Sequence, residues 1–314
     1  MAAFIVRRIL LSLIVLFLVS VFAFLLLHMI PGDPVLTMLG QDASLEQIEM
    51  LRKELFLDRP IYEQFGRWLW NAMRGDFGKS IIFRENVVNL IGARLPITMY
   101  LSIIAMIFST FLGIFFGVIC AIRRGSVLDQ TITVFANLGV TVPLFWLGIL
   151  GIYLFGLKLG WLPIQGFTSP LENLGLSVRQ SVMPIFCLAL PGIAIMARQT
   201  RSSMLEVTRQ DYVRTAWAKG LKERVVVTKH ALKNALIPVV TLLGMHLRTL
   251  VGGSVLVEQV FNIPGMGRLL VSSVFNKDFV IVQAGTFIIA LVVLFANLLV
   301  DISYGWLDPR IRYE

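Results

Sequence analysis

The sequence predicts an all-α integral membrane protein with six transmembrane helices. Hydrophobic residues make up 57% of the chain and charged residues 15%, and the mean hydropathy is +0.80. A typical soluble domain carries about 25% charged residues. A bilayer core about 30 Å thick needs about 20 helical residues to span it. Six apolar blocks approach or exceed that length, and the fourth is the shortest: residues 9–29, 96–122, 132–156, 182–197, 235–257 and 279–306.

The composition also bounds the partners of the chain. Its formal net charge is +9, which in a soluble protein would suggest nucleic acid. Here Lys and Arg lie beside the apolar blocks, where they orient the spans and meet anionic lipid headgroups. We therefore expect the lipid bilayer, and no nucleic acid, among the partners. Cys120 and Cys187 lie within apolar blocks without metal-ligand spacing, so we interpret them as packing residues.

Residues 1–30 are interpreted as the N-terminus and first transmembrane helix. The apolar run that follows Arg7 and Arg8 is longer than the about 7–15 residues of a signal peptide. We therefore expect it to remain in the protein as an anchor.

Residues 31–95 are expected to form a small helical cap outside the membrane. Ser44 and Gln47 have the spacing of a capping box at a helix N-terminus. Pro60 is expected to begin a second helix, and residues 75–78, Gly-Asp-Phe-Gly, to form a turn. We interpret the tryptophans of the cap, Trp68 and Trp70, as membrane-interface anchors.

Residues 96–314 are expected to form the core domain, with the other five spans. Gly113 and Gly117 have the small-xxx-small spacing that lets two membrane helices approach closely. With six spans, both chain ends lie on one side. Lys and Arg are concentrated on that side, above all in residues 198–238, so the positive-inside rule predicts that these segments are cytoplasmic.

The cytoplasmic stretch 198–238 carries a pattern of two helices around a glycine. Residues 212–219 favour a helix, Gly220 permits the positive φ of a helix end, and a second helical run extends from Lys222 to Leu232. This arrangement is typical of a docking element between two spans. A basic amphipathic hairpin that rests on anionic lipid is the alternative.

The sequence predicts no catalytic site. It contains no phosphate-binding loop, no His-Glu-x-x-His pair and no Gly-x-Ser-x-Gly elbow. His28, His230 and His246 are scattered along the chain, and we interpret them as isolated packing or hydrogen-bonding residues. Energy for uphill transport would therefore have to come from another protein.

The cytoplasmic stretch 198–238 resembles the EAA motif of ABC importer permeases. Arg214-Thr215-Ala216 occupies the position of the Glu-Ala-Ala triplet, and Gly220 that of the motif glycine. Arg214, Thr215 and Lys233 depart from the general motif but match its peptide/nickel subfamily. Members of that subfamily typically read Arg-Thr-Ala-x-Ala-Lys-Gly. The stretch that follows in those proteins is similar to residues 232–238 of this chain, Leu-Lys-Asn-Ala-Leu-Ile-Pro. Further segments that resemble this subfamily run from end to end of the chain: 28–34, 75–78, 198–204, 252–254, 257–261, 264–267 and 308–312.

The resemblance implies a type I importer-like permease fold with a cytoplasmic coupling-helix hairpin. It implies a second, homologous permease subunit, two cytoplasmic ATPases that bind ATP and Mg, and an extracytoplasmic solute-binding protein. The cargo would be a dipeptide, an oligopeptide, glutathione, nickel or a metal–chelator complex. A stand-alone channel or secondary carrier is the alternative. The residues expected to couple the chain to an ATPase are Tyr212, Arg214, Thr215, Ala216, Trp217, Lys219, Gly220, Lys222, Arg224 and Val225, with Val226 as a further apolar anchor.

The candidate substrate path comprises His246, Arg248 and Glu258. Arg248 lies near the middle of the fifth block, where a charge costs about 2.5–3.5 kcal/mol, so it is expected to face a watery cavity or a partner group. Its role could be to meet an anionic cargo, or to form a salt bridge with Glu258, Asp301 or the partner subunit. His246 points about 200° away around the helix. Glu258 and residues 264–267 are expected to shape a gate-like turn.

Overall fold

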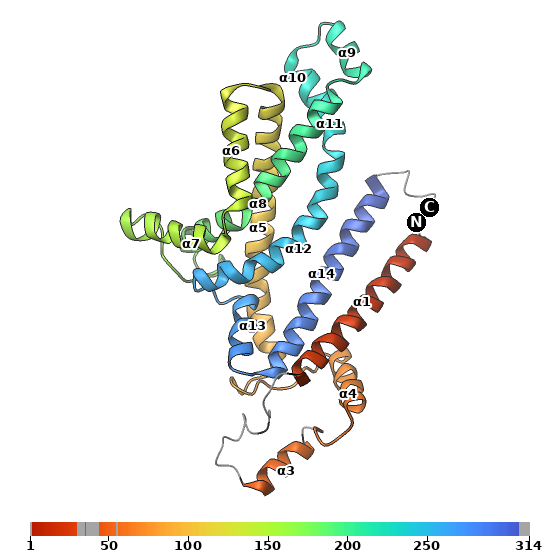
Figure 1. The fold of residues 1–314 in the computed structure, drawn as a ribbon, viewed down its shortest axis with the longest axis vertical. Coiled ribbons are helices and arrows are strands. Elements are labelled where there is room, and N and C mark those ends of the chain that lie inside the picture. Colours follow the sequence, from red (N-terminus) through yellow and green to blue (C-terminus); the bar gives the residue numbers. More distant parts are fainter. Residues whose placement is uncertain (1, 30–34, 36–43, 55, 308–314) are drawn as a thin grey trace. The chain divides into compact units, whose positions relative to one another are not determined.

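The computed structural model describes residues 2–29, 35, 44–54 and 56–307. In this part of the chain all regular elements are helices, accompanied by one isolated β-bridge between Lys79 and Asn86. The helices group into two compact units, which we describe separately (Figure 1). The first unit contains the residues up to Ile97 and those from Gly265 onwards, and the second contains Thr98–Pro264.

The first unit consists of the two ends of the chain and the cap. Its helices are α1 (Ala2–Met29), α3 (Leu45–Glu54), α4 (Ile61–Met73), the first part of α5 (Val87–Ile122), α13 (Met266–Phe275) and α14 (Phe279–Leu307). Helices α1 and α14 lie side by side in Figure 1.

The predicted cap features are present in this unit. The Ser44 hydroxyl accepts from the Gln47 backbone N–H at 3.3 Å, and Gln47 accepts in return from the Ser44 N–H at 3.1 Å, which confirms the capping box. Pro60 directly precedes α4. Gly75 and Gly78 both have φ of +81°, as the predicted turn between them requires. The segment 30–34, expected to end the first span, lies outside the described residues.

A hydrophobic cluster built from α4, α5, α13 and α14 forms the core of the first unit. Trp68 packs against this cluster, with its ring 5.6 Å from that of Phe287 in an edge-to-face arrangement. Trp70 is exposed, with Arg74 over its ring. Trp68 therefore packs against the hydrophobic core of this unit. Trp70 is the more exposed of the two tryptophans and fits the predicted role of an interface anchor better.

The second unit contains the remaining helices. They are the rest of α5, α6 (Val127–Thr141), α7 (Leu144–Gly151), η1 (Ile152–Lys158), α8 (Leu174–Val207), α9 (Asp211–Ala218), α10 (Glu223–Val225), η2 (Val226–Ala231), α11 (Leu232–Ala235) and α12 (Ile237–Val260).

Four described helices are long and apolar enough to cross a membrane, namely α1, α5, α8 and α14. A fifth span is present if α6 and the α7–η1 pair are taken as one broken segment. The structure thus supports four or five spans in its described part, and six spans stay a prediction. Helix α12 covers the predicted fifth block.

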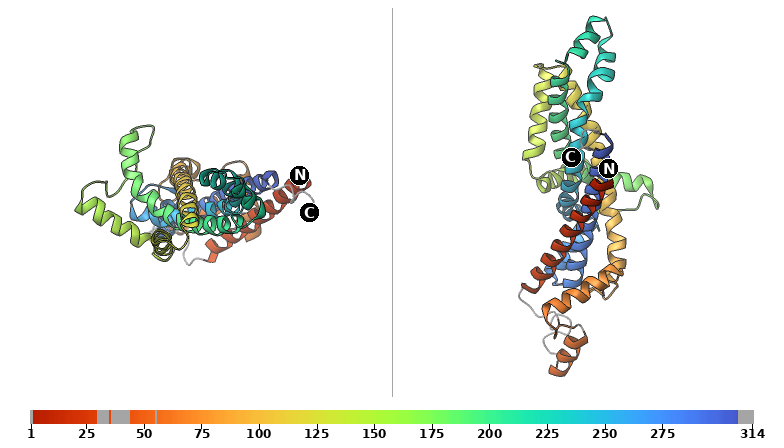
Figure 2. Two further views of the ribbon diagram at one scale, coloured as in Figure 1. Left: turned by 90° about the horizontal axis from the view of Figure 1, so that it is seen from above. Right: turned by 90° about the vertical axis from the view of Figure 1, so that its right-hand side faces the viewer.

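The predicted third block is not one straight helix. Helix α6 ends at Thr141, and α7 with η1 continues at a bend of 107° (Figure 2). Pro143 lacks a backbone N–H, and its ring forces the preceding residue away from helical angles. Val142 accordingly has φ −77° and ψ 128°. The apolar length of the block was visible in the sequence, whereas its direction change depended on this proline.

Helix α8 is the helix around which the second unit packs. Its backbone lies directly against Gly113 and Gly117 of α5, because a Cβ added at Gly117 would lie 2.5 Å from Thr200 Cβ and 2.6 Å from the Ala197 carbonyl oxygen. On α6, a Cβ added at Gly139 would lie 3.0 Å from Leu190 Cγ, so α6 packs on the Leu190 side chain of α8. The close helix approach predicted from the Gly113/Gly117 spacing is confirmed.

We expect Gly117→Ala to destabilise the protein by about 1–3 kcal/mol, because the added methyl group overpacks the α5–α8 contact. Gly92→Ala is the matched control on the same helix, since a Cβ there meets nothing within 4 Å. It should leave stability unchanged or raise it by up to about 1 kcal/mol through helix propensity. Thermal unfolding of the two purified variants in detergent checks this, and equal midpoints would contradict the packing argument.

Candidate functional site

The segment Asp211–Ala235, here called the hairpin, connects α8 to α12. Helix α9 ends at Ala218, and Gly220 follows with φ of +73°. The Gly220 N–H donates to the Trp217 carbonyl, and the Leu221 N–H reaches back to the Ala216 carbonyl. Glycine is favoured at such a helix end because it has no Cβ to strain the left-handed conformation. Helices α10, η2 and α11 then return towards α12.

A small apolar core holds the two arms of the hairpin together. Val213 and Ala216 of α9 are buried against Val226 of η2, and Val207 at the end of α8 packs on the same cluster. Val226 therefore stabilises the hairpin from inside and is not available as a surface anchor, contrary to expectation. Ala216 has the same internal role, because it is buried in this cluster.

A second cluster joins the returning arm to the helices beneath it. Met204 of α8 packs with Val227, Ala231 and Ala235, and two residues of α5, Val118 and Ala121, complete the contact. The Asn234 side-chain amide also donates to the Tyr212 hydroxyl at 2.7 Å, which links α11 to α9. The hairpin is thus attached to α5 and α8 by packed side chains.

The outer surface of the hairpin combines exposed apolar side chains with basic ones. Tyr212, Trp217, Leu221 and Val225 are all more than a third exposed. The basic residues Arg214, Lys219, Lys222 and Arg224 are exposed around them. The Arg214 guanidinium lies 3.6 Å from Asp211, in a fully solvated pair. The hairpin projects beyond the ends of α5 and α6 (Figures 1 and 2).

The structure thus brings the predicted coupling residues into one segment. Of the ten, only Ala216 is buried, and the other nine are exposed. Thr215 uses its hydroxyl within its own helix, where it donates to the Asp211 carbonyl at 2.8 Å. Leu221 belongs to the same surface, although sequence reasoning did not include it.

The predicted path residues do not form one cluster. His246 is buried where α12 crosses α5 and α8, with Nε2 3.0 Å from the Ser109 hydroxyl. It lies against the bare backbone of Gly192, because a Cβ there would be 2.1 Å from Nε2. Glu258 is fully buried and accepts from the Thr98 hydroxyl at 2.6 Å. Twelve residues of helix, about 18 Å, separate His246 from Glu258. The side chains of Arg248 and Asp301 lie outside the described part.

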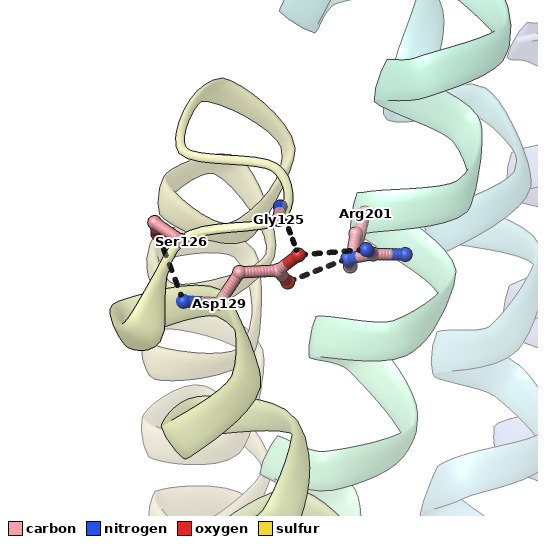
Figure 3. Close-up of polar contacts among 4 residues, drawn as sticks. All are labelled: Gly125, Ser126, Asp129 and Arg201. Carbon is pink, nitrogen blue, oxygen red and sulfur yellow. Dashed lines mark hydrogen bonds and ion pairs between the residues drawn. The ribbon is translucent and has the colours of Figure 1, made fainter.

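One ion pair in the second unit, with a buried carboxylate and a partly exposed guanidinium, was missed by sequence reasoning. Arg201 of α8 donates from Nε and Nη2 to the two oxygens of Asp129 on α6, both at 2.8 Å (Figure 3). The only hint was Ser126 three residues before Asp129, a helix-capping pattern. No group of three or more His, Cys, Asp and Glu side chains suited to a metal gathers within the described residues.

Comparison with known families matches nearly the whole chain. Residues 113–313 match the family described as "Binding-protein-dependent transport system inner membrane component". Residues 1–102 match the N-terminal family "Binding-prot-dependent transport system membrane comp, N-term".

The chain is also similar to curated proteins over its full length. It is 41% identical, over 314 residues and 100% of both chains, to a putative peptide transport system permease protein of Brucella abortus (strain 2308). The same identity and coverage relate it to the glutathione transport system permease protein of Escherichia coli (strain K12). A probable peptide ABC transporter permease protein of Sinorhizobium fredii is 40% identical, again over 100% of both chains.

Solved structures show the same fold at lower identity. An inward-facing structure of the MetNI methionine ABC transporter matches 68% of this chain and 95% of its own, with a TM-score of 0.54 and 19% identity. A crystal structure of an amino acid ABC transporter with histidines matches 68% and 92%, with a TM-score of 0.51 and 15% identity.

Replacement of Gly220 tests the turn of the hairpin. We expect Gly220→Val to strain the left-handed backbone by about 1–2 kcal/mol, whereas Gly220→Asn is tolerated because Asn adopts this conformation. Trypsin cleavage at Lys219 and Lys222 reports local opening of the hairpin. Cleavage of the Val variant should be about tenfold faster, and the Asn variant should resemble the parent. Equal protection of the Val variant would contradict the inferred strain.

Proposed function

Because this chain belongs to the family of binding-protein-dependent transport system inner membrane components, we propose that it is the membrane subunit of an ATP-driven importer for peptides or a related small solute. One observation carries this conclusion, the 41% identity over full length to permeases named for peptide and glutathione transport. Glutathione is itself a small peptide, so both names point to one class of cargo. Nickel or a metal–chelator complex is the further cargo that the sequence suggested.

Such a subunit works within an assembly. We propose a second, homologous permease subunit, two cytoplasmic ATPases and an extracytoplasmic solute-binding protein as its partners. ATP and Mg would be bound by the ATPases, and this chain would form half of the path through the bacterial inner membrane. In this arrangement both chain ends and the hairpin face the cytoplasm, as the distribution of Lys and Arg indicates.

The exposed side of the hairpin supports a role as the site where an ATPase docks. Apolar side chains surrounded by basic ones suit a groove with an apolar floor and an acidic rim, because buried aromatic anchors supply affinity and rim charges steer encounter. The hairpin would insert Trp217 and Leu221 into this floor. Because the hairpin packs on α5 and α8 from inside, closure of the ATPases would move those helices.

The alternative of a channel or ion-driven carrier predicts transport by this chain alone. Liposomes that contain the purified complex, with a peptide and the binding protein outside, separate the two. We expect uptake only with ATP inside and only when all subunits are present. Uptake by this chain alone, or uptake driven by an ion gradient without ATP, would overturn the proposal.

Trp217→Ala tests docking at the hairpin. We expect about 30-fold weaker ATPase binding, since truncation of a central aromatic anchor commonly costs 2 kcal/mol or more. Trp70→Ala is the matched control, because Trp70 is similarly exposed, at 53% against 47%, but lies in the cap. Co-purification of the ATPases measures the effect. A hairpin that merely rests on lipid would retain the ATPases in both variants.

Arg248→Ala tests the proposed substrate path. If Arg248 meets an anionic group of the cargo, its loss should lower uptake about tenfold, the usual effect of removing a hydrogen bond to a charged group. Assembly and melting temperature should stay unchanged. Normal uptake combined with a less stable complex would instead assign Arg248 to a salt bridge.

A further inference from the structure

The ion pair between the buried Asp129 carboxylate and the partly exposed Arg201 guanidinium connects the start of α6 with α8 close to the hairpin. Asp129 is only 4% exposed, although it carries a charge. Besides the two bonds from Arg201, its Oδ2 atom accepts from the Gly125 N–H at 3.0 Å. The Ser126 hydroxyl caps α6 by accepting from the Asp129 N–H at 3.3 Å (Figure 3). One carboxylate therefore holds the α5–α6 turn and binds α8.

An ion pair here does something that the neighbouring apolar contacts do not. Burying the Asp129 carboxylate costs desolvation free energy, and the Arg201 side chain stays a third exposed, so the pair adds little net stability compared with apolar packing. A two-pronged guanidinium–carboxylate contact, however, fits only one relative position of the two helices. The glycine faces of α5 let α8 approach closely, and the pair fixes the register of α6 along it.

The position of the pair places it where force from the hairpin would enter the second unit. Arg201 precedes Met204 by less than one helical turn, and Met204 is in the cluster that carries the returning arm. Val118 and Ala121, which complete this cluster, lie at the end of α5 that leads into the turn held by Asp129. In Figure 1 the α5–α6 turn and the hairpin lie at the same end of this unit.

We propose that Asp129 and Arg201 are positioning residues that keep α5, α6 and α8 together as one body throughout the transport cycle. Movement of the hairpin is thereby delivered to α6, which has no direct place in the two hairpin clusters. This inference rests on the proposed function, because it assumes that an ATPase moves the hairpin. Without the pair, α8 would slide against α6, and ATP would be hydrolysed with little transport.

Neutralisation of the pair is the first test. Asp129→Asn keeps an oxygen for the Gly125 N–H and removes the charge that Arg201 binds, and Arg201→Gln removes the other partner. In the full complex in liposomes, we expect uptake to fall about tenfold, with the ATPases still bound and ATP still hydrolysed. Asp58→Asn is the matched control, because Asp58 pairs with Arg59 at 3.9 Å on an exposed surface. Uptake at the parental rate in both neutralised variants overturns the proposal.

The second test replaces the ion pair by a chemical cross-link. It remains informative if a neutralised variant assembles poorly. The chain is first made free of native thiols by Cys120→Ala and Cys187→Ala, since both cysteines are free and buried. Asp129→Cys and Arg201→Cys are then joined by a short bifunctional thiol reagent. We expect the link to restore uptake towards the level of the thiol-free parent. If the linked complex stays as slow as the unlinked one, α6 and α8 must separate during transport, and the proposal is wrong.

Failure of this inference can be told apart from failure of the proposed function. If the chain is not an ATP-driven permease, the parent complex itself shows no ATP-dependent uptake. If only the inference fails, the parent transports normally and the neutralised or linked variants give the overturning results. The ratio of ATP hydrolysed to peptide taken up is the decisive measurement, because a purely structural defect lowers both quantities together.

Discussion

Close contact between helix backbones at α8 is the constraint on which the second unit depends. Inside a bilayer, apolar side chains gain nothing by leaving lipid for another helix, so association relies on close van der Waals packing and hydrogen bonds. Gly113 and Gly117 bring α5 onto α8, and Gly192 leaves room on α8 for the His246 ring of α12. A methyl group at any of these positions would push two helices apart. The ion pair between Asp129 and Arg201 adds a polar contact to the same helix α8.

The hairpin is held in place by side chains that pack on these same helices. An isolated helix of eight residues such as α9 is marginal in water, because nucleation of a helix is costly. Here Val213 and Ala216 fasten α9 to η2, and the Met204 cluster fastens η2 and α11 to α5 and α8. A surface element held in this way can transmit a push, whereas a flexible loop would absorb it. The exposed apolar side chains Trp217, Leu221 and Val225 lie outside this internal core.

Local chemistry was predictable from the sequence, and contacts between distant segments were not. The capping box at Ser44 and the turn at Gly220 each depend on a few neighbouring residues, and the spacing of Gly113 and Gly117 predicted a close approach without naming the partner helix. The bend at Pro143 was missed because the third span was predicted from the length of its apolar block alone. A proline inside such a block indicates that the helix can end at the preceding residue. The pairing of Asp129 with Arg201 joins residues far apart in the sequence, and no periodicity reports such a contact. The place of His246 in a substrate path stays a prediction; its Ser109 and Gly192 neighbours come from other helices, so the local sequence did not show them.

The two kinds of contact on α8 have complementary roles in a protein that must change conformation. The glycines of α5 let its backbone approach α8 closely, but a glycine face carries no polar group that would fix the position of α6 along α8. A two-pronged ion pair is intolerant of sliding, because a shift of one helical step separates both oxygens from their donors. A group of helices that moves as one body needs both a close approach and a contact that fixes the register. On α8 the glycines of α5 supply the first and the ion pair with Asp129, near the hairpin, supplies the second.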